Sequence, residues 1–116
     1  MQLETTLSDE LTRYLDLATR QIQVTAANMA NIDTPGYRSV GLDFDAAMQE
    51  ALADGGESPV HPRIRPVGGL VVRPDGNDVS MDRESMQMAE AQLRYKTGVA
   101  LLRSEYTEIF AAIHAK

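Results

Sequence analysis

Apolar residues near the C-terminus recur at alternating spacings of four and three, which is the pattern of a helix with one continuous apolar face. The positions on this face are Met81, Ser85, Met88, Gln92, Tyr95, Val99, Leu102, Tyr106, Ile109 and Ile113. The pattern predicts one helix over residues 80–114, about 50 Å long at a rise of about 1.5 Å per residue. So long a helix exceeds what a compact chain of this size needs for its own core, so we expect another chain to cover part of the face.

The start of this helix is marked by a residue that can cap it. Ser80 can accept hydrogen bonds from the first free N–H groups, and Glu84 lies near the positive end of the helix dipole. Two features weaken the apolar face: Gly98 costs about 1 kcal/mol relative to alanine, and Gln92 is polar. Gln92 either fixes the register with a partner or lies at a wet edge of the face.

The N-terminal part of the chain carries a second apolar face, which predicts a helix over residues 8–33. Its positions are Leu7, Leu11, Tyr14, Ala18, Ile22, Thr25, Met29 and Ile32. Two long helices that each bury only one face predict an all-α fold, namely an antiparallel coiled-coil hairpin of the N- and C-terminal segments. We expect the isolated chain to be marginally stable and to show less helix in dilute solution than these ranges imply.

The middle segment, residues 34–79, is expected to be a largely irregular excursion within a single domain of residues 1–116. A short helix capped by Asp43 is predicted where Phe44, Met48 and Leu52 lie one turn apart. Residues 53–69 then hold three of the five prolines and four of the eight glycines, which disfavours regular structure. Residues 70–73 are expected to form a short strand or an extended arm.

The composition excludes several classes of function. The net charge of −6, with no basic cluster, disfavours binding to nucleic acid or to an anionic membrane. The chain has no cysteine, and neither His61 nor His114 lies at a metal-ligand spacing, so we predict no catalytic, cofactor-binding or metal site. No segment has the apolar length of a membrane span, and the N-terminus lacks the features of a secretory signal.

A distinctive motif follows the first helix. We call it the asparagine–proline motif, and it consists of Asn28, Asn31, Thr34, Pro35, Gly36 and Tyr37. Pro35 disfavours further helix and Gly36 can supply the positive φ of a type II turn, so the helix is expected to end near residue 33. Asn28 and Asn31 lie on one face of the last turn, where their amides either cap the helix or reach a neighbouring chain.

This motif resembles the N-terminal signature of the flagellar rod and hook family of axial proteins. Residues 76–84, GNDVSMDRE, followed by residues 88–95, MAEAQLRY, look like the start of the C-terminal helix in a proximal-rod member of that family. The two stretches and the shared layout cover nearly the whole chain. The resemblance implies a structural subunit of the proximal rod, which stacks helically, crosses the periplasm and transmits torque from the motor ring.

The resemblance also implies partners. These are copies of the same chain, the rod proteins FlgC, FlgF and FliE, the base of the motor ring, and the gate of the flagellar type III export apparatus; nucleic acid and direct membrane insertion are not among them. The asparagine–proline motif is expected to serve assembly. Nine residues are expected to form the interface along the two helices, and we call them the helix-face residues: Leu11, Ile22, Met29, Met88, Tyr95, Val99, Leu102, Tyr106 and Ile109.

Two questions stay open at the level of sequence. Phe44 and Met48, four residues apart, resemble a short signal read by the export gate, and they equally fit a small amphipathic helix that docks on the long ones. The main alternative function is a soluble coiled-coil adaptor or secretion chaperone, with a small enzyme a distant third. Those alternatives predict a stable monomer or closed oligomer, whereas a rod subunit is expected to become ordered on assembly.

Overall fold

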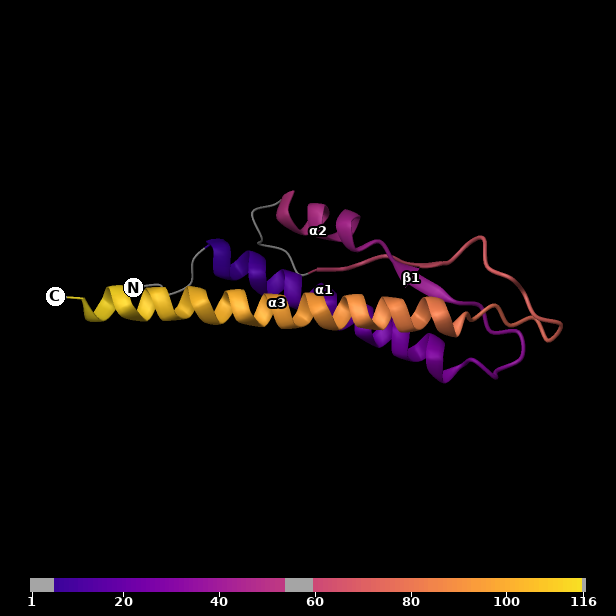
Figure 1. Ribbon diagram of the computed structural model, residues 1–116. Coiled ribbons are helices and arrows are strands. Elements are labelled where there is room, and N and C mark those ends of the chain that lie inside the picture. The colour runs from indigo at the N-terminus through magenta and orange to yellow at the C-terminus, as the bar shows by residue number, and fades with distance from the viewer. Residues whose placement is uncertain (1–5, 54–59, 116) are drawn as a thin grey trace.

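The computed structural model describes residues 6–53 and 60–115, which form three helices and a two-stranded sheet. The elements are α1 (Thr6–Ala30), β1 (Val40–Leu42), α2 (Phe44–Ala53), β2 (Ile64–Pro66) and α3 (Met81–His114). The molecule measures 69 × 25 × 17 Å and has a radius of gyration of 17.9 Å, well above the roughly 13 Å of a compact chain of this length. Figure 1 shows that this elongation comes from α3, which runs along most of the long axis.

The two long helices pack side by side in opposite directions. Asn28, near the end of α1, bonds Glu84, near the start of α3, whereas Gly98 further along α3 faces Leu15. The C-terminal part of α3 projects beyond the start of α1 (Figure 1). The prediction of two long helices is confirmed, and the side chain of Ser80 caps α3 by accepting from the N–H of Arg83 at 3.3 Å. The predicted end of α1 is three residues too late, because α1 ends at Ala30 and turns follow over residues 31–33.

The face that α3 turns toward α1 is offset by one residue from the predicted apolar face. Its buried residues are Glu84, Ala91 and Gly98, spaced by seven. The predicted positions Ser85 and Gln92 are exposed. Tyr95, the next position of the predicted face, is also 43% exposed. In this part of α3 the predicted apolar face therefore lies beside the interface with α1, and its role in contacts with another chain stays a prediction. Ala91 and Gly98 are small and let the two backbones approach closely, whereas Glu84 accepts a hydrogen bond from Asn28 of α1.

The same offset is seen on α1. The buried positions of this helix are Ser8, Leu17, Ala18, Gln21, Val24, Thr25 and Asn28. The predicted helix-face residues Leu11, Ile22 and Met29 are only half-buried, and they flank this interface. Polar side chains in the interface are bonded to α3: Gln21 donates to Gln87 and accepts from Arg94, at 3.1 and 2.7 Å.

Gly98 lies where the two helices are closest. A Cβ atom at this position would lie 2.7 Å from Leu15 Cδ2 and 3.0 Å from Tyr14 Cδ1, both shorter than an ordinary contact. Gly98 therefore lowers the helix propensity of α3 but permits α1 and α3 to approach each other closely.

Replacing Gly98 with leucine is expected to lower the free energy of unfolding by about 1–3 kcal/mol, the usual cost of overpacking a close-packed interface. Urea unfolding followed by circular dichroism measures the change. The matched control is Ala100→Leu, two residues away at an exposed position of the same helix, which should be nearly neutral. Equal effects of the two substitutions would contradict a close contact at Gly98.

The small hydrophobic core lies between α1 and α2. Its buried residues are Leu17, Ala18, Phe44 and Ala47, with Tyr14, Leu42, Met48 and Val60 packed around them. The predicted cap of α2 is confirmed, because the Asp43 carboxylate accepts from the N–H of Ala46 at 3.1 Å.

The sheet corrects the expectation of an all-α fold. β1 and β2 pair antiparallel, with Val40 opposite Pro66 and Leu42 opposite Ile64. β2 lies inside the range predicted to be irregular, and residues 70–73, predicted as a strand or extended arm, form no strand. A high content of proline and glycine does not exclude an edge strand of three residues, because an edge strand tolerates a proline, as β2 does at Pro66.

Candidate assembly site

A cluster of buried polar side chains joins the end of α1, the sheet and the start of α3. We call Asn28, Tyr37 and Glu84 the polar cluster. Asn28, only 1% exposed, is at its centre: its amide nitrogen donates to the Val40 carbonyl at 2.7 Å and to Glu84 Oε2 at 3.1 Å. Its amide oxygen accepts from the Tyr37 hydroxyl at 2.9 Å and from the N–H of Val40 at 3.1 Å. The Asn28 amide therefore uses all four of its hydrogen-bonding positions within the chain.

Glu84 places a carboxylate in the same cluster. Its exposure is 0%, and Arg83 Nη1 lies 2.6 Å from Glu84 Oε1. A buried carboxylate without such partners would be strongly destabilising, so the adjacent arginine and Asn28 together allow it to be buried. Glu84 thus lies at the positive end of the helix dipole, as its place in the first turn predicts, and also bonds Asn28 across the interface.

Tyr37 closes the cluster from the loop after α1. Burial raises the pKa of its hydroxyl, and the negative charges of Glu84 and Asp78 raise that pKa further. The hydroxyl therefore stays protonated at neutral pH and can donate to Asn28. Because the pKa is higher in the folded chain than in the unfolded one, this contribution to stability is complete below about pH 10 and is lost as the pH rises further.

Two tight turns lie next to this cluster, at the end of the molecule opposite the C-terminus. Gly36 has the predicted positive φ, 75°, and the N–H of Tyr37 donates to Thr34 across the turn. In the second turn Gly76 has φ 86°, and a Cβ there would lie 3.3 Å from the Cα of Gly36. The N–H of Gly36 also donates to the carbonyl of Asp75 at 2.9 Å. Glycine at both positions lets the two turns pack directly on each other.

Side chains from the segment before α3 bond the backbone of the first turn. The fully buried Asn77 donates its amide to the carbonyls of Asn31 and Thr34, both at 2.9 Å. Arg73 donates to the carbonyls of Ile32 and Val79. In the same region Asp78 accepts from the N–H of Ser39 at 2.6 Å. These bonds replace the helical partners that the end of α1 leaves free.

The predicted asparagine–proline motif is thus brought together, but its members differ. Asn28 is buried and Tyr37 is half-buried, and both bond within the chain, whereas Thr34, Pro35 and Gly36 are exposed. Asn31 caps α1 by donating to the carbonyl of Ala27 at 2.8 Å. A role of this motif in assembly stays a prediction, and the structure assigns it an intrachain role as well.

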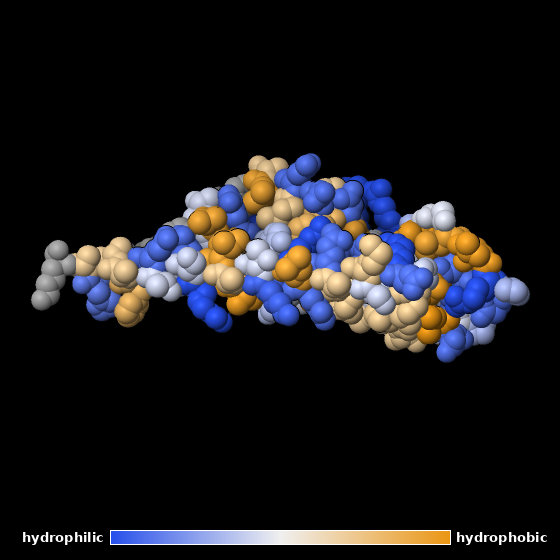
Figure 2. Space-filling view, in the orientation of Figure 1, coloured by the Kyte–Doolittle hydropathy of each residue, from blue (hydrophilic) through white to orange (hydrophobic). Residues whose placement is uncertain are grey.

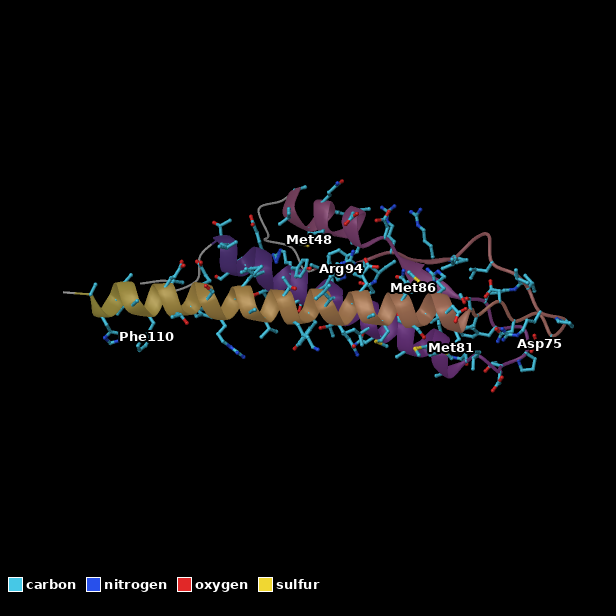
Figure 3. All side chains as sticks on the ribbon, viewed as in Figure 1. Met48, Asp75, Met81, Met86, Arg94 and Phe110 are labelled. Atoms are coloured by element: carbon cyan, nitrogen blue, oxygen red, sulfur yellow. The ribbon has the colours of Figure 1, made fainter. Side chains whose placement is uncertain are left out.

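Phe44 and Met48 belong to the core in the folded chain. The Phe44 ring packs edge-on against Tyr14, with ring centroids 5.3 Å apart, and the guanidinium of Arg94 lies 3.9 Å from the centroid of Phe44. Met48 lies half-buried beside it and is labelled in Figure 3. The docking role of this pair is therefore seen directly, while its role in export stays a prediction.

Three of the helix-face residues, Val99, Leu102 and Tyr106, line a groove on the C-terminal half of α3 that no other described element covers. The groove has a volume of 520 Å³ and is lined by Val99, Leu102, Arg103, Tyr106, Thr107 and Phe110. Phe110 is 66% exposed, and Figure 3 shows it on the part of α3 that projects past α1. A row of large apolar side chains along an unpacked helix marks an interaction surface.

No three histidine, aspartate or glutamate side chains within residues 6–53 and 60–115 are placed to hold a metal ion. Among the same residues, no helix has the length and apolar character needed to cross a membrane. An elongated helical chain with an internal polar cluster and an exposed apolar row on α3 defines the class: an elongated, helical structural protein.

Comparison with known proteins identifies the family. The family model described as flagella basal body rod protein matches residues 15–38, the end of α1 together with the asparagine–proline motif. The flagellar basal body rod protein FlgB of Salmonella typhimurium is 32% identical over 78% of this chain and 80% of its own length. Those of Escherichia coli and Cereibacter sphaeroides are 30% and 33% identical, covering 78% and 75% of this chain and 80% and 77% of their own lengths. The chain belongs to the FlgB family of flagellar basal body rod proteins, which are structural proteins of the basal body and not enzymes.

Proposed function

We propose that this chain is a building block of the proximal rod, where it stacks helically with copies of itself and transmits torque from the motor ring. The uncovered groove on α3 is the observation that carries the proposal. Apolar side chains at Val99, Leu102 and Tyr106 have no covering element among the described residues, and a neighbouring helix would bury them. We infer that α1 and α3 continue as a coiled-coil hairpin in the assembled rod, with the whole chain acting as one domain.

The helix-face residues divide between two kinds of neighbour in this proposal. Positions in the first half of α3, such as Met88 and Tyr95, flank the interface with α1 and are open to a partner on the other side. Those in the second half, from Val99 onward, lie beside the start of α1 and past it, and would contact the next subunit. The rod proteins FlgC, FlgF and FliE and the base of the motor ring are the proposed partners of these surfaces and of the exposed turn at Pro35.

We also propose that the chain reaches the rod through the flagellar type III export gate, before it folds. Phe44 is 8% exposed in the folded chain, so a signal that contains Phe44 and Met48 could be read only in the unfolded chain. The hydrophobic cluster between α1 and α2 is small, since its buried residues are Leu17, Ala18, Phe44 and Ala47. So thin a core supports export before folding, because little stability opposes unfolding.

Isolation of basal bodies tests the proposed function. A strain that lacks the gene is expected to be non-motile, and a copy with a short tag after residue 116 should restore swimming. The tagged chain should then co-purify with the detergent-resistant basal body, in the fraction that holds the rod. Swimming without the gene, or a tagged chain found only in the soluble fraction of swimming cells, would reject the proposal in favour of a soluble adaptor.

A further inference from the structure

Two short rows of charge lie on the outer sides of the long helices. On α1, Asp9 and Asp16 are seven residues apart, and on α3, Lys96 and Arg103 have the same spacing. Seven residues are close to two helical turns, so the members of each pair lie on one face of their helix, about 10 Å apart. Asp16, Lys96 and Arg103 are exposed, and Asp9 is half-buried. We call the pair on α1 the acidic row and the pair on α3 the basic row.

Each row faces away from the other long helix. Gly98 marks the side of α3 that meets α1, since a Cβ there would contact Tyr14 and Leu15. At about 100° per residue, Lys96 and Arg103 lie about 140–160° around α3 from Gly98. By the same measure, the acidic row lies about 150–170° around α1 from the midpoint between Tyr14 and Leu15. The two rows are therefore on opposite sides of the helix pair.

The two rows also lie at the same height along the molecule. Asn28 of α1 bonds Glu84 of α3, and the two helices run in opposite directions, so equal counts back along α1 and forward along α3 reach the same level. Counting twelve residues from this contact gives Asp16 and Lys96, and counting nineteen gives the other member of each row. The contact of Gly98 with α1 fits the same register.

The charges of both rows are unpaired inside the molecule. The ion pairs found within residues 6–53 and 60–115 include no member of either row. Arg13 and Arg20 follow the two aspartates at a spacing of four, but no ion pair joins them to the acidic row, and Arg20 donates to Gln23 at 3.2 Å. Both rows are therefore open to charges on another molecule.

The basic row borders the uncovered groove of α3. Among the described residues that line this groove only Arg103 is charged, and Leu102, Tyr106 and Phe110 supply its large apolar side chains. Figure 2 shows hydrophilic residues among hydrophobic ones along α3. A helix from another chain that pairs with the basic row would therefore also cover apolar surface, which stabilises the contact beyond the ion pairs alone.

We propose that the acidic row of one copy lies against the basic row of a second copy beside it. When two copies stand side by side in the same orientation and at the same height, α1 of one runs antiparallel to α3 of the other. Asp16 then meets Lys96 and Asp9 meets Arg103, because the rows share their spacing and their height. The contact joins two different surfaces, so it repeats from copy to copy. The inference rests on the proposed rod function and adds the lateral contact that orders neighbouring copies.

Charge reversal in living cells tests the contact. One variant carries Asp9→Lys with Asp16→Lys, and the other carries Lys96→Glu with Arg103→Glu. Each should abolish swimming in soft agar, because like charges then face each other in every contact between copies. All four substitutions in one chain should restore swimming, because the reversed rows match again. Damage to folding by either pair predicts no such recovery, since the two rows do not touch within one molecule.

The matched control is Asp45→Lys with Glu50→Lys, which changes the net charge as much as reversal of the acidic row does, at exposed positions of α2, and should leave swimming unchanged. Normal swimming with either reversed row overturns the contact and leaves the rod function standing, because the tagged chain would still co-purify with the basal body. Loss of swimming that the fourfold variant does not recover also overturns the contact, and would assign the rows to folding or to another partner.

Cross-linking identifies the neighbour directly, because the chain has no cysteine of its own. Asp16→Cys combined with Lys96→Cys should give a ladder of multimers when isolated basal bodies are treated with a short bis-maleimide, since the two positions lie on opposite sides of one molecule. Neither single substitution should give a ladder. The absence of multimers from basal bodies that contain the doubly substituted chain overturns the contact, as does a link from either position to a different rod protein in place of a second copy.

Discussion

Replacement of Asn28 by leucine is expected to lower the free energy of unfolding by about 3–5 kcal/mol, enough to abolish cooperative unfolding in a marginal chain. The apolar side chain would leave the Tyr37 hydroxyl, both backbone groups of Val40 and one oxygen of Glu84 without their bonds to the amide. Each buried group that loses its partner costs about 1–3 kcal/mol. Leucine is similar in size, so the loss would come from the hydrogen bonds rather than from a cavity.

The matched control is the other asparagine of the motif. Asn31→Ala removes two bonds of a half-exposed side chain, one donated to the Ala27 carbonyl and one accepted from the Thr34 hydroxyl. Water can replace both, so the substitution should cost about 1 kcal/mol or less. Urea unfolding followed by circular dichroism compares the two variants. Similar small effects for both would mean that water replaces the Asn28 amide and that the polar cluster does not hold the fold together.

Whether a feature of the fold or of the polar cluster could be predicted from the sequence depends on the chemistry of the residues that form it. The asparagine–proline motif and the Ser80 and Asp43 caps were predictable, because proline, glycine and capping residues act on their own backbone neighbours. Gly36 has the expected positive φ for the same local reason. The long helices were predictable from their period, although α1 ends three residues before the predicted boundary.

The face of α3 that meets α1 could not be predicted from hydrophobic periodicity. Its buried residues, Glu84, Ala91 and Gly98, are small or charged, so a search for large apolar side chains selects the adjacent row. Close helix packing favours small residues, and an ion pair with Arg83 allows a carboxylate inside. Gly98 was seen only as a weak point of the helix, although the structure shows it as the contact that brings the helices together.

Only two of the three members of the polar cluster could be recognised from the sequence. Asn28 and Tyr37 were marked by their motif, but their partner Glu84 is 56 residues from Asn28, and no local rule connects such positions. Asn77 is likewise joined to Asn31 across 46 residues. The small sheet was missed for a related reason, because β1 and β2 are three residues each and are stabilised by each other rather than by their own propensity.

The second large effect is expected from Leu102→Asp, which should abolish rod formation. Leu102 lines the uncovered groove of α3 with Val99 and Tyr106, so an assembled neighbour would bury the new carboxylate among apolar side chains without a partner. Burying an unpaired charge costs several kcal/mol, more than a single subunit contact can offset. Export should persist, because it involves the unfolded chain. Motility would therefore be lost while the protein is still secreted.

The control for this substitution is Glu108→Lys, which changes an exposed charge outside the groove and should leave swimming nearly unaffected, since exposed charges contribute about 1 kcal/mol or less. Swimming in soft agar, secreted protein in the medium and electron microscopy of basal bodies together locate the defect. Because Leu102 lies past most of the interface with α1, the purified variant should keep its helical spectrum. Full motility with Leu102→Asp would show that the groove faces solvent in the rod, and the neighbouring subunits would then have to meet through other surfaces.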